Sequence, residues 1–300
     1  MKSVFISLAL LVLLLAAGVL YVTFGGYFSL QPKTLPTESP SFTGKITGEL
    51  RYHPAMQGDG IRERNVIVWL PPDYHNNTDS TYSVLYMHDG QNIIDPATSF
   101  IGVDWQIDES VDSLIRVGSI DPMIVVGIYN TDDRLYEYTP GEKGDAYMKF
   151  VTGKLKTFID ENYRTKSDRD HTFVGGSSAG GIISFMIVWE YPEVFSKAII
   201  MSPAFRNPDS FNYKFNYIDV VNQTTEIPEN VFFYIDNGGL DLDAQLQPGI
   251  DEMLIALDSK GYVLNRDFVF VKDEPATHSE KAWANRFPDA LKAILTSDHN

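Results

Sequence analysis

The sequence predicts an α/β protein with a mostly parallel central sheet, an antiparallel N-terminal edge and helices on both faces. Eight short apolar runs have the length of strands, and five longer segments have the spacing of helices. The first runs follow one another closely, as in a hairpin, whereas the later runs alternate with helical segments, as in βαβ units. The 300 residues, of which 44% are hydrophobic, suffice for one large domain behind a leader.

The predicted elements lie between residues 46 and 295. Strands are expected at 46–52, 65–70, 82–87, 123–128, 172–175, 198–201, 231–235 and 268–271. Helices are expected at 105–115, 146–163, 179–191, 244–259 and 278–295. The first two strands are separated by a short polar segment and form the antiparallel edge. Most later strands are separated from the next by a helix, which favours parallel pairing.

The N-terminal segment has the pattern of a membrane anchor. Residues 4–22 are apolar except for Ser7 and Gly18, and about 20 helical residues at ~1.5 Å each cross a ~30 Å hydrocarbon core. We predict a transmembrane signal anchor at 1–24. The alternative is a cleaved signal peptide, although its apolar part usually has only about 7–15 residues. Lys2 favours an exported domain, anchored in the periplasm or outside the cell, or secreted after cleavage.

Residues 25–44 mix Pro, Gly, Ser and Thr, which predicts a linker to an α/β-domain at 45–300. The 24 basic and 40 acidic residues give a formal net charge of -16, which argues against nucleic acid or an anionic membrane surface as the main partner. Membrane contact is therefore expected through the N-terminal segment only. The sequence contains no cysteine, which excludes disulfides, thiolate catalysis and cysteine-bound metal.

The segment from Gly176 to Gly180 fits the pattern G-x-S-x-G, with Ser178 at its centre. A short apolar run enters it and a helical segment leaves it, which is the context of a nucleophile elbow. Glycine flanks are needed because larger side chains would collide on so sharp a turn. A glycine-rich loop is the simpler alternative. We predict that Ser178 is the nucleophile of an α/β-hydrolase fold, and that Ser177 is only its neighbour.

A serine nucleophile needs a base and an acid, which follow it in the order Ser, Asp or Glu, His in α/β-hydrolases. Only His278 and His299 lie beyond the acidic candidates, and His299 is the penultimate residue. His278 lies between the last predicted strand and the last predicted helix. Thr277 and Glu280 have the spacing of a capping box, which predicts His278 at the first helical position. His278 is therefore the predicted base.

The acid is expected after the strand at 231–235, where Asp236, Asp241 and Asp243 follow. Asp241 comes after a glycine turn and is the first choice, with Asp243 second. Asp236 could instead cap the turn, and Asp243 could begin the next helix. A calcium loop is another interpretation, but the spacing does not match its motif.

The oxyanion hole needs two backbone N–H groups, one after the nucleophile and one from the loop after an early strand. The predicted donors are the N–H groups of Ala179 and Gln91. Gln91 follows Asp89 and Gly90, and glycine lets the backbone approach a substrate. An ordinary Asp-Gly turn is the alternative for this loop.

Five segments together carry a resemblance to a known family: 66–74, 84–92, 130–140, 176–181 and 278–283. In them the chain resembles the bacterial putative-esterase (esterase D-like) family of α/β-hydrolases, which includes enterochelin and siderophore esterases and feruloyl and acetylxylan esterases. The likeness covers roughly residues 45–295. The chain departs from the family at Ala179, where methionine is frequent, which leaves the backbone donor but changes the wall of the pocket.

The resemblance implies a hydrolase with Ser178 as nucleophile, His278 as base and an acid in the region of Asp241. It also implies that the loop at 130–138 borders the site. Asp89, Arg134 and Glu137 are therefore candidate substrate-binding residues.

These expectations describe a serine carboxylic-ester hydrolase that acts through an acyl-enzyme on a small acylated molecule, either an acylated carbohydrate or a siderophore ester. The mechanism needs no metal and no organic cofactor. Two alternatives are an acyltransferase that uses the same triad and a membrane-tethered binding module of the same fold without activity.

Overall fold

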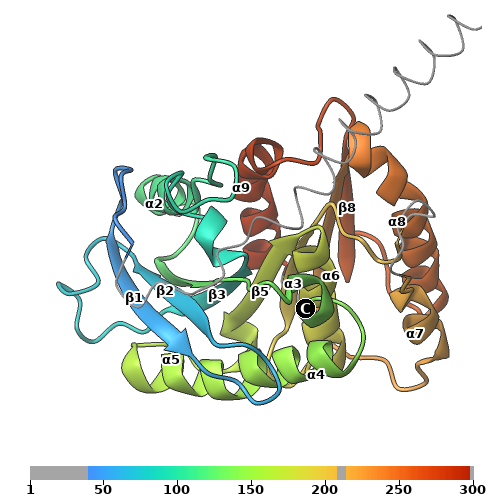
Figure 1. The fold of residues 1–300 in the computed structure, drawn as a ribbon, viewed down its shortest axis with the longest axis horizontal. Helices are drawn as coiled ribbons and strands as arrows, with labels where there is room; N and C mark the ends of the chain where they lie inside the picture. Colours follow the sequence, from blue (N-terminus) through green and yellow to red (C-terminus); the bar gives the residue numbers. More distant parts are fainter. Residues whose placement is uncertain (1–39, 208–213, 298–300) are drawn as a thin grey trace, which may run out of the picture. The chain divides into compact units, whose positions relative to one another are not determined.

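An eight-stranded sheet forms the centre of the computed structural model, which describes residues 40–207 and 214–297 (Figure 1). Along the sheet the strands lie in the order β1-β2-β4-β3-β5-β6-β7-β8. The strands are β1 (Glu49–Met56), β2 (Arg64–Leu70), β3 (Ser83–His88), β4 (Met123–Ile128), β5 (Thr172–Ser177), β6 (Lys197–Met201), β7 (Phe232–Gly238) and β8 (Phe268–Asp273). Each corresponds to one predicted strand.

Only one edge of the sheet is antiparallel. β1 pairs antiparallel with β2 and β2 with β4, whereas every pairing from β4 to β8 is parallel. Four strands, β2, β4, β5 and β7, are buried along their whole length, as expected where helices cover both faces. The predicted fold class, an α/β-hydrolase fold with a mostly parallel sheet and an antiparallel N-terminal edge, is confirmed.

Helices cover both faces of the sheet. They are α2 (Ile107–Arg116), α3 (Arg134–Glu137), α4 (Glu142–Lys149), α5 (Lys156–Asn162), α6 (Ala179–Glu190), α7 (Tyr217–Gln223), α8 (Asp241–Ser259) and α9 (Glu280–Thr296). One apolar core lies between the sheet and α4 to α8, and a second lies between the sheet and the neighbouring helices α2 and α9 (Figure 1). Successive residues of β3 alternate between the cores: Val84 and Tyr86 face the first, and Leu85 and Met87 face the second.

The predicted helix at 146–163 is longer and less regular than expected. It begins at Glu142, and a π-helical segment, η4 (Phe150–Leu155), connects α4 to α5. The short helices α3 and α7 were not among the predicted elements. The segment of α3 was expected to be a loop, and no element was predicted at the position of α7.

The last helix begins two residues later than predicted. Ser279 is its N-cap, and the Ser279 hydroxyl accepts from the Ala282 N–H at 3.4 Å. The backbone of Ser279 is extended, so the chain has not yet entered the helix at His278. The predicted capping box, with Thr277 as the cap and His278 in the first turn, is therefore wrong.

The end of the predicted linker at 25–44 is attached to the domain. The N–H groups of Thr43 and Gly44 donate to Asp95 Oδ2 at 2.7 and 2.6 Å. The described residues all belong to one compact unit. The predicted anchor at 1–24 lies outside the described residues, and no helix within them has the length and hydropathy of a membrane span.

Candidate active site

The carboxyl ends of the parallel strands bring the predicted residues to one edge of the sheet. Asp89 follows β3, Ser178 follows β5 and His278 follows β8. The segment with the candidate acids continues from β7 into α8. Ligands of open α/β sheets bind at this edge, because the loops that follow parallel strands converge there.

Ser178 lies on a strained turn between β5 and α6. Its φ of 56° and ψ of -119° are angles that residues with a side chain rarely adopt. The Ser178 N–H donates to the Met201 carbonyl at 2.9 Å, and a side chain at Gly176 would meet the Gly180 carbonyl oxygen at 2.8 Å. Ser177 ends β5 and is only 5% exposed, whereas Ser178 is half-buried. The turn therefore presents Ser178 rather than Ser177 at the edge of the sheet.

His278 contacts a buried aspartate. Its Nδ1 lies 2.6 Å from Asp243 Oδ1, and the side chains of His278 and Asp243 are 12% and 0% exposed. A carboxylate can only accept here, so Nδ1 carries the hydrogen and Nε2 is left as the basic nitrogen. This is the tautomer that a general base requires.

The structure pairs His278 with Asp243, the second choice, and not with Asp241, the first choice. Asp241 is the first residue of α8 and is exposed, with a φ of 54°. Asp243 lies two residues further along the first turn, where its Oδ2 accepts the Gly238 N–H at 3.0 Å. The start of the helix thus turns Asp243 inwards and Asp241 outwards.

The third candidate acid, Asp236, is part of a different ion pair. Its Oδ2 accepts from Arg286 Nε at 2.9 Å and its Oδ1 from Arg286 Nη2 at 3.1 Å. Burial raises the pKa of Asp236, and the contacts with Arg286 offset this only in part. Asp236 is therefore committed to Arg286 rather than to His278.

The two predicted oxyanion donors lie at the starts of two helical segments at this edge of the sheet. Ala179 is the first residue of α6, and Gln91 lies in the short helix η3 (Gly90–Asn92) after β3. The first N–H groups of a helix have no hydrogen-bond partner within that helix. Neither of these two N–H groups is therefore used by its own helix. A side chain added at Gly180 would lie 3.3 Å from Asp89 Oδ2, which shows how closely the loop after β3 approaches α6.

Asp89 and Arg134, two predicted substrate-binding residues, bind each other. Arg134 Nε and Nη2 donate to Asp89 Oδ1 and Oδ2, both at 2.7 Å, and Asn130 Nδ2 donates to Oδ1 at 2.5 Å. Burial alone would raise the pKa of Asp89, but the Arg134 charge and these hydrogen bonds outweigh it and hold the pKa below its ordinary value. The pair joins the loop after β3 to the loop after β4.

Glu137, the third predicted substrate-binding residue, lies in the core instead. Glu137 Oε1 and Oε2 accept from Arg64 at 2.7 and 3.1 Å, and both side chains are 0% exposed. Thr131 donates to the same carboxylate at 3.1 Å. Glu137 therefore fastens the loop after β4 to β2 and cannot contact a substrate in this arrangement.

Two further polar residues lie in this region: Glu280, which the sequence predicted only as the partner of a capping box, and Ser202, which it did not indicate at all. Glu280 is 4% exposed, and burial raises its pKa, with the Asp89 charge adding to the increase. Ser202, directly after β6, is 0% exposed and donates to Asp243 Oδ2 at 3.2 Å. The position of Glu280 two residues after His278 was a usable signal, whereas Ser202 belongs to no motif.

Another histidine at this edge is unsuited to act as a base. His88, the last residue of β3, is 2% exposed, and its Nδ1 lies 2.8 Å from the Tyr147 hydroxyl. Burial lowers the pKa of His88 to about 3. His88 is therefore a neutral residue of the packed interior.

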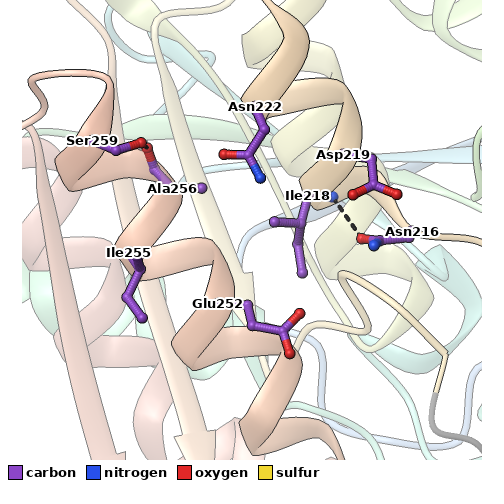
Figure 2. A pocket seen from close by; sticks show the side chains of 8 residues that line it. All are labelled: Asn216, Ile218, Asp219, Asn222, Glu252, Ile255, Ala256 and Ser259. Atoms are coloured by element: carbon purple, nitrogen blue, oxygen red, sulfur yellow. Dashed lines mark hydrogen bonds between the residues drawn. The ribbon is translucent and has the colours of Figure 1, made fainter.

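The hollow drawn in Figure 2 lies between α7 and α8, and no candidate catalytic residue lines it. Its lining includes Asp219 and Glu252, and within it Asn216 accepts the Ile218 N–H at 3.0 Å (Figure 2). Among the described residues, no group of three or more His, Asp or Glu side chains could hold a metal ion.

A family model described as "Putative esterase" matches residues 61–294 of the chain. Two curated relatives from Bacillus subtilis (strain 168) are similar to part of it. The uncharacterized protein YjcH is 29% identical over 144 residues, and the uncharacterized protein YbbA is 27% identical over 148. These matches cover 47% and 45% of this chain, and 56% and 54% of the relatives, so the chain spans about half the length of each.

Other similar proteins have named activities. An endo-1,4-beta-xylanase/feruloyl esterase of Xylanibacter ruminicola is 28% identical over 158 residues, 49% of this chain and 21% of the relative. A ferulic acid esterase structure aligns with 85% of this chain and 100% of its own, with a TM-score of 0.67 and 19% identity. The enterobactin esterase FES of Shigella flexneri aligns with 83% of this chain and 59% of its own, with a TM-score of 0.65 and 14% identity. At these identities the structural likeness concerns the fold.

Proposed function

The chain belongs to the putative-esterase family, and from this premise we propose that it is a serine carboxylic-ester hydrolase that acts through an acyl-enzyme. The observation that carries the proposal is the contact of 2.6 Å between His278 Nδ1 and Asp243 Oδ1, at the same edge of the sheet as the strained turn of Ser178. A serine on a sharp turn, a base and a buried acid are the groups that acyl transfer requires.

In the proposed mechanism, His278 Nε2 takes the proton of Ser178 Oγ as that oxygen attacks the ester carbonyl carbon. Asp243 holds the imidazole in the correct tautomer and stabilises the imidazolium. The N–H groups of Ala179 and Gln91 donate to the oxyanion of the tetrahedral intermediate. His278 then gives its proton to the departing alcohol, and water repeats the sequence on the acyl-enzyme.

The first test is the pair of variants Ser178→Ala and Ser177→Ala. We expect Ser178→Ala to lower kcat for p-nitrophenyl acetate by about 10⁴-fold, because the nucleophile is lost. Ser177→Ala is the matched control on the neighbouring residue and should keep most of the activity. Undiminished hydrolysis by purified Ser178→Ala protein contradicts the proposal.

The second test separates the two aspartates of α8. Asp243→Asn should lower kcat by about 10³- to 10⁴-fold, because an amide at this position favours the wrong tautomer of His278. Asp241→Asn, two residues earlier and exposed, should keep nearly full activity. The reverse result would assign the acid to Asp241.

We propose as substrates small acylated molecules, either acylated carbohydrates or siderophore esters. This is supported by the names of the similar proteins, a feruloyl esterase, a ferulic acid esterase and an enterobactin esterase. A panel with short acyl esters, feruloyl esters and a triscatecholate siderophore tests it. Hydrolysis of simple alkyl and p-nitrophenyl esters alone, with no hydrolysis of an acetylated carbohydrate, a feruloyl ester or the siderophore, contradicts the substrate proposal while leaving the esterase proposal intact.

We further propose that the domain works outside the cytoplasm, tethered through residues 1–24. The apolar stretch at 4–22 supports this. N-terminal sequencing of the mature protein, with extraction of membranes at high pH, distinguishes an intact anchor from a cleaved signal peptide. Full-length protein in the soluble cytoplasmic fraction would contradict export.

A further inference from the structure

We propose that Ser202 is a positioning residue for the acid of the proposed triad: its hydroxyl holds Asp243 as a charged acceptor for His278. Ser202 comes directly after β6 and its side chain lies beneath the Asp243–His278 pair, so it touches no substrate. The inference rests on the proposed function, because it assigns a role within the same site.

The contacts of the Ser202 hydroxyl form a compact, buried network. Its Oγ lies 3.2 Å from Asp243 Oδ2, 3.0 Å from Trp283 Nε1 and 3.1 Å from Arg286 Nη2. Ser202 and Asp243 are 0% exposed, and Trp283 and Arg286 are 6% and 7% exposed. Because water is largely excluded, these hydrogen bonds have no ready substitute.

The chemistry of these partners determines the direction of the hydroxyl hydrogen. The indole Nε1–H of Trp283 and the guanidinium N–H of Arg286 can only donate, so both lone pairs of the Ser202 oxygen are occupied. Its single hydrogen is then left for Asp243 Oδ2, which can only accept when ionised. Arg286 therefore polarises the Ser202 hydroxyl, which strengthens the hydrogen bond that this hydroxyl donates to Asp243.

The same network restrains the histidine. The Trp283 ring packs edge-on against the His278 ring, with centroids 4.9 Å apart and an interplanar angle of 84°. Arg286 is itself held by both oxygens of Asp236. The Ser202 hydroxyl thus contacts Asp243, the proposed acid, and also Trp283, which packs against the proposed base.

The backbone of Ser202 is held in a conformation that favours glycine. Its φ is 43°, and its N–H donates to the Asp236 carbonyl oxygen at 2.9 Å and to Asp236 Oδ1 at 3.2 Å. Glycine would relieve this strain but would remove the hydroxyl. Ser202→Gly is therefore an informative variant, because it removes the hydroxyl without adding backbone strain.

The experiment compares the full-length wild-type protein with Ser202→Ala and Ser202→Gly, using the pH profile of kcat/KM for p-nitrophenyl acetate. We expect the plateau to fall about 10-fold in both variants, the effect of losing a hydrogen bond to a charged group. We also expect the midpoint of the acidic limb to move to higher pH. An Asp243 carboxylate with one donor fewer holds the proton on His278 more strongly.

The substitution leaves the other titratable groups around the network unchanged. They are Arg286 and Glu280 of α9, Asp236 and Tyr234 of β7, Asp273 of β8, and His278 itself. A shift of the acidic limb can therefore be attributed to the lost hydroxyl. A purely structural role would lower the plateau without moving the limb.

Agreement between Ser202→Ala and Ser202→Gly separates the loss of the hydroxyl from damage to the fold, because both lack the hydroxyl but only the alanine is strained at this φ. An unchanged plateau and limb in Ser202→Gly overturns the inference, and so does a lower plateau with an unmoved limb. If the wild-type protein shows no Ser178-dependent hydrolysis, the proposed function fails instead. The low-field proton resonance of the His278 Nδ1–H then tests the inference without activity: it should shift in both variants, and an unshifted resonance overturns the proposal.

Discussion

Two buried Asp–Arg pairs flank the candidate site, and they have the same local geometry. In each, an aspartate at the carboxyl end of a parallel strand binds the Nε and Nη2 atoms of an arginine through both carboxylate oxygens. Asp89 pairs with Arg134 of α3, and Asp236 pairs with Arg286 of α9. The first lies beside the loop with the proposed oxyanion donor, and the second lies beneath the proposed acid.

The surroundings of the two pairs give them opposite electrostatic behaviour. The pKa of Asp89 is held below its ordinary value, although burial opposes this, because Arg134 and Asn130 both bind the carboxylate. Burial raises the pKa of Asp236, Arg286 offsets this in part, and the nearby charge of Asp243 adds to the increase. The side chain of Arg134 is 22% exposed and that of Arg286 only 7%. An identical ion pair can therefore fasten a surface loop in one place and support a buried acid in another.

The largest difference should appear in stability after each aspartate is removed. Asp236→Ala leaves Arg286 buried without its main partner and should lower the free energy of unfolding by about 3–5 kcal/mol. Asp89→Ala leaves Arg134 with access to water, so we expect a smaller loss of about 1–3 kcal/mol. Urea unfolding followed by circular dichroism measures both. Equal losses would mean that the difference in exposure has no energetic consequence.

The second comparison uses a glycine on each side of the site: Gly238 beside Asp243, and Gly180 beside Asp89. An added Cβ at Gly238 would collide with Asp243 Oδ2 and lie 2.5 Å from the Ala276 carbonyl oxygen, so Gly238→Ala should displace the proposed acid. We expect kcat/KM to fall by about 100-fold, because small displacements of a catalytic group have large effects. Gly180, the second glycine of the turn, has more room than the sequence motif led us to expect: the nearest atoms to an added Cβ are Asp89 Oδ2 at 3.3 Å and His88 Cβ at 3.4 Å, and neither belongs to the backbone. Gly180→Ala should therefore lower kcat/KM by less than about threefold. Comparable losses of kcat/KM in the two variants would contradict the expectation that activity depends more on the surroundings of Asp243 than on those of Asp89.

A third prediction concerns the arginine fork on the oxyanion side. Arg134→Lys cannot keep both hydrogen bonds to Asp89, which precedes the turn that carries Gln91. We expect kcat/KM for p-nitrophenyl acetate to fall about 10-fold, the effect of one hydrogen bond between charged groups. Arg206→Lys is the matched control, because Arg206 Nε and Nη2 form the same fork on the two oxygens of Glu252, each at 3.0 Å, and Glu252 is not a candidate site residue. If both substitutions have the same effect, the Arg134 fork has no special role in the site.

The smallest expected effect is a pH-dependent gain in stability from Glu280→Gln. Burial raises the pKa of Glu280, and no partner for its Oε2 lies among the described residues. The folded protein therefore binds this proton more tightly than the unfolded chain, and the wild type loses stability as pH rises from about 4.3 through the raised pKa. Glutamine does not titrate, so the variant should be more stable by about 1 kcal/mol at pH 8 and gain nothing below pH 4.

Thermal unfolding at the two pH values measures this difference. Glu161→Gln, on the exposed side of α5, serves as the control and should show no such dependence. A destabilised Glu280→Gln variant at pH 8 would mean that the ionised carboxylate is favourable where it lies, most simply through Arg134.

The strands were predictable because most of them are buried on both faces. Such strands are short and almost wholly apolar, so β4 was predicted at its observed bounds and β2 within one residue. The π-helical segment η4 was not predicted, because its residues contain no proline and the sequence therefore favoured one continuous helix through them. The short helix α3 owes its place to Glu137, whose partner Arg64 is far away in the sequence.

The sequence by itself determined the α/β class, the order of the strands and helices, and the local turn that presents Ser178, because these depend on neighbouring residues and their spacing. It also placed His278 in the loop after the last strand. Only the tertiary structure decided between Asp241 and Asp243, because two residues on one helical turn point in directions that differ by about 200°. The tertiary structure also decided that Glu137 lies in the core and that Ser202 lies next to Asp243. These contacts join segments that are distant in the chain. The local pattern of residues does not indicate burial that depends on a distant partner.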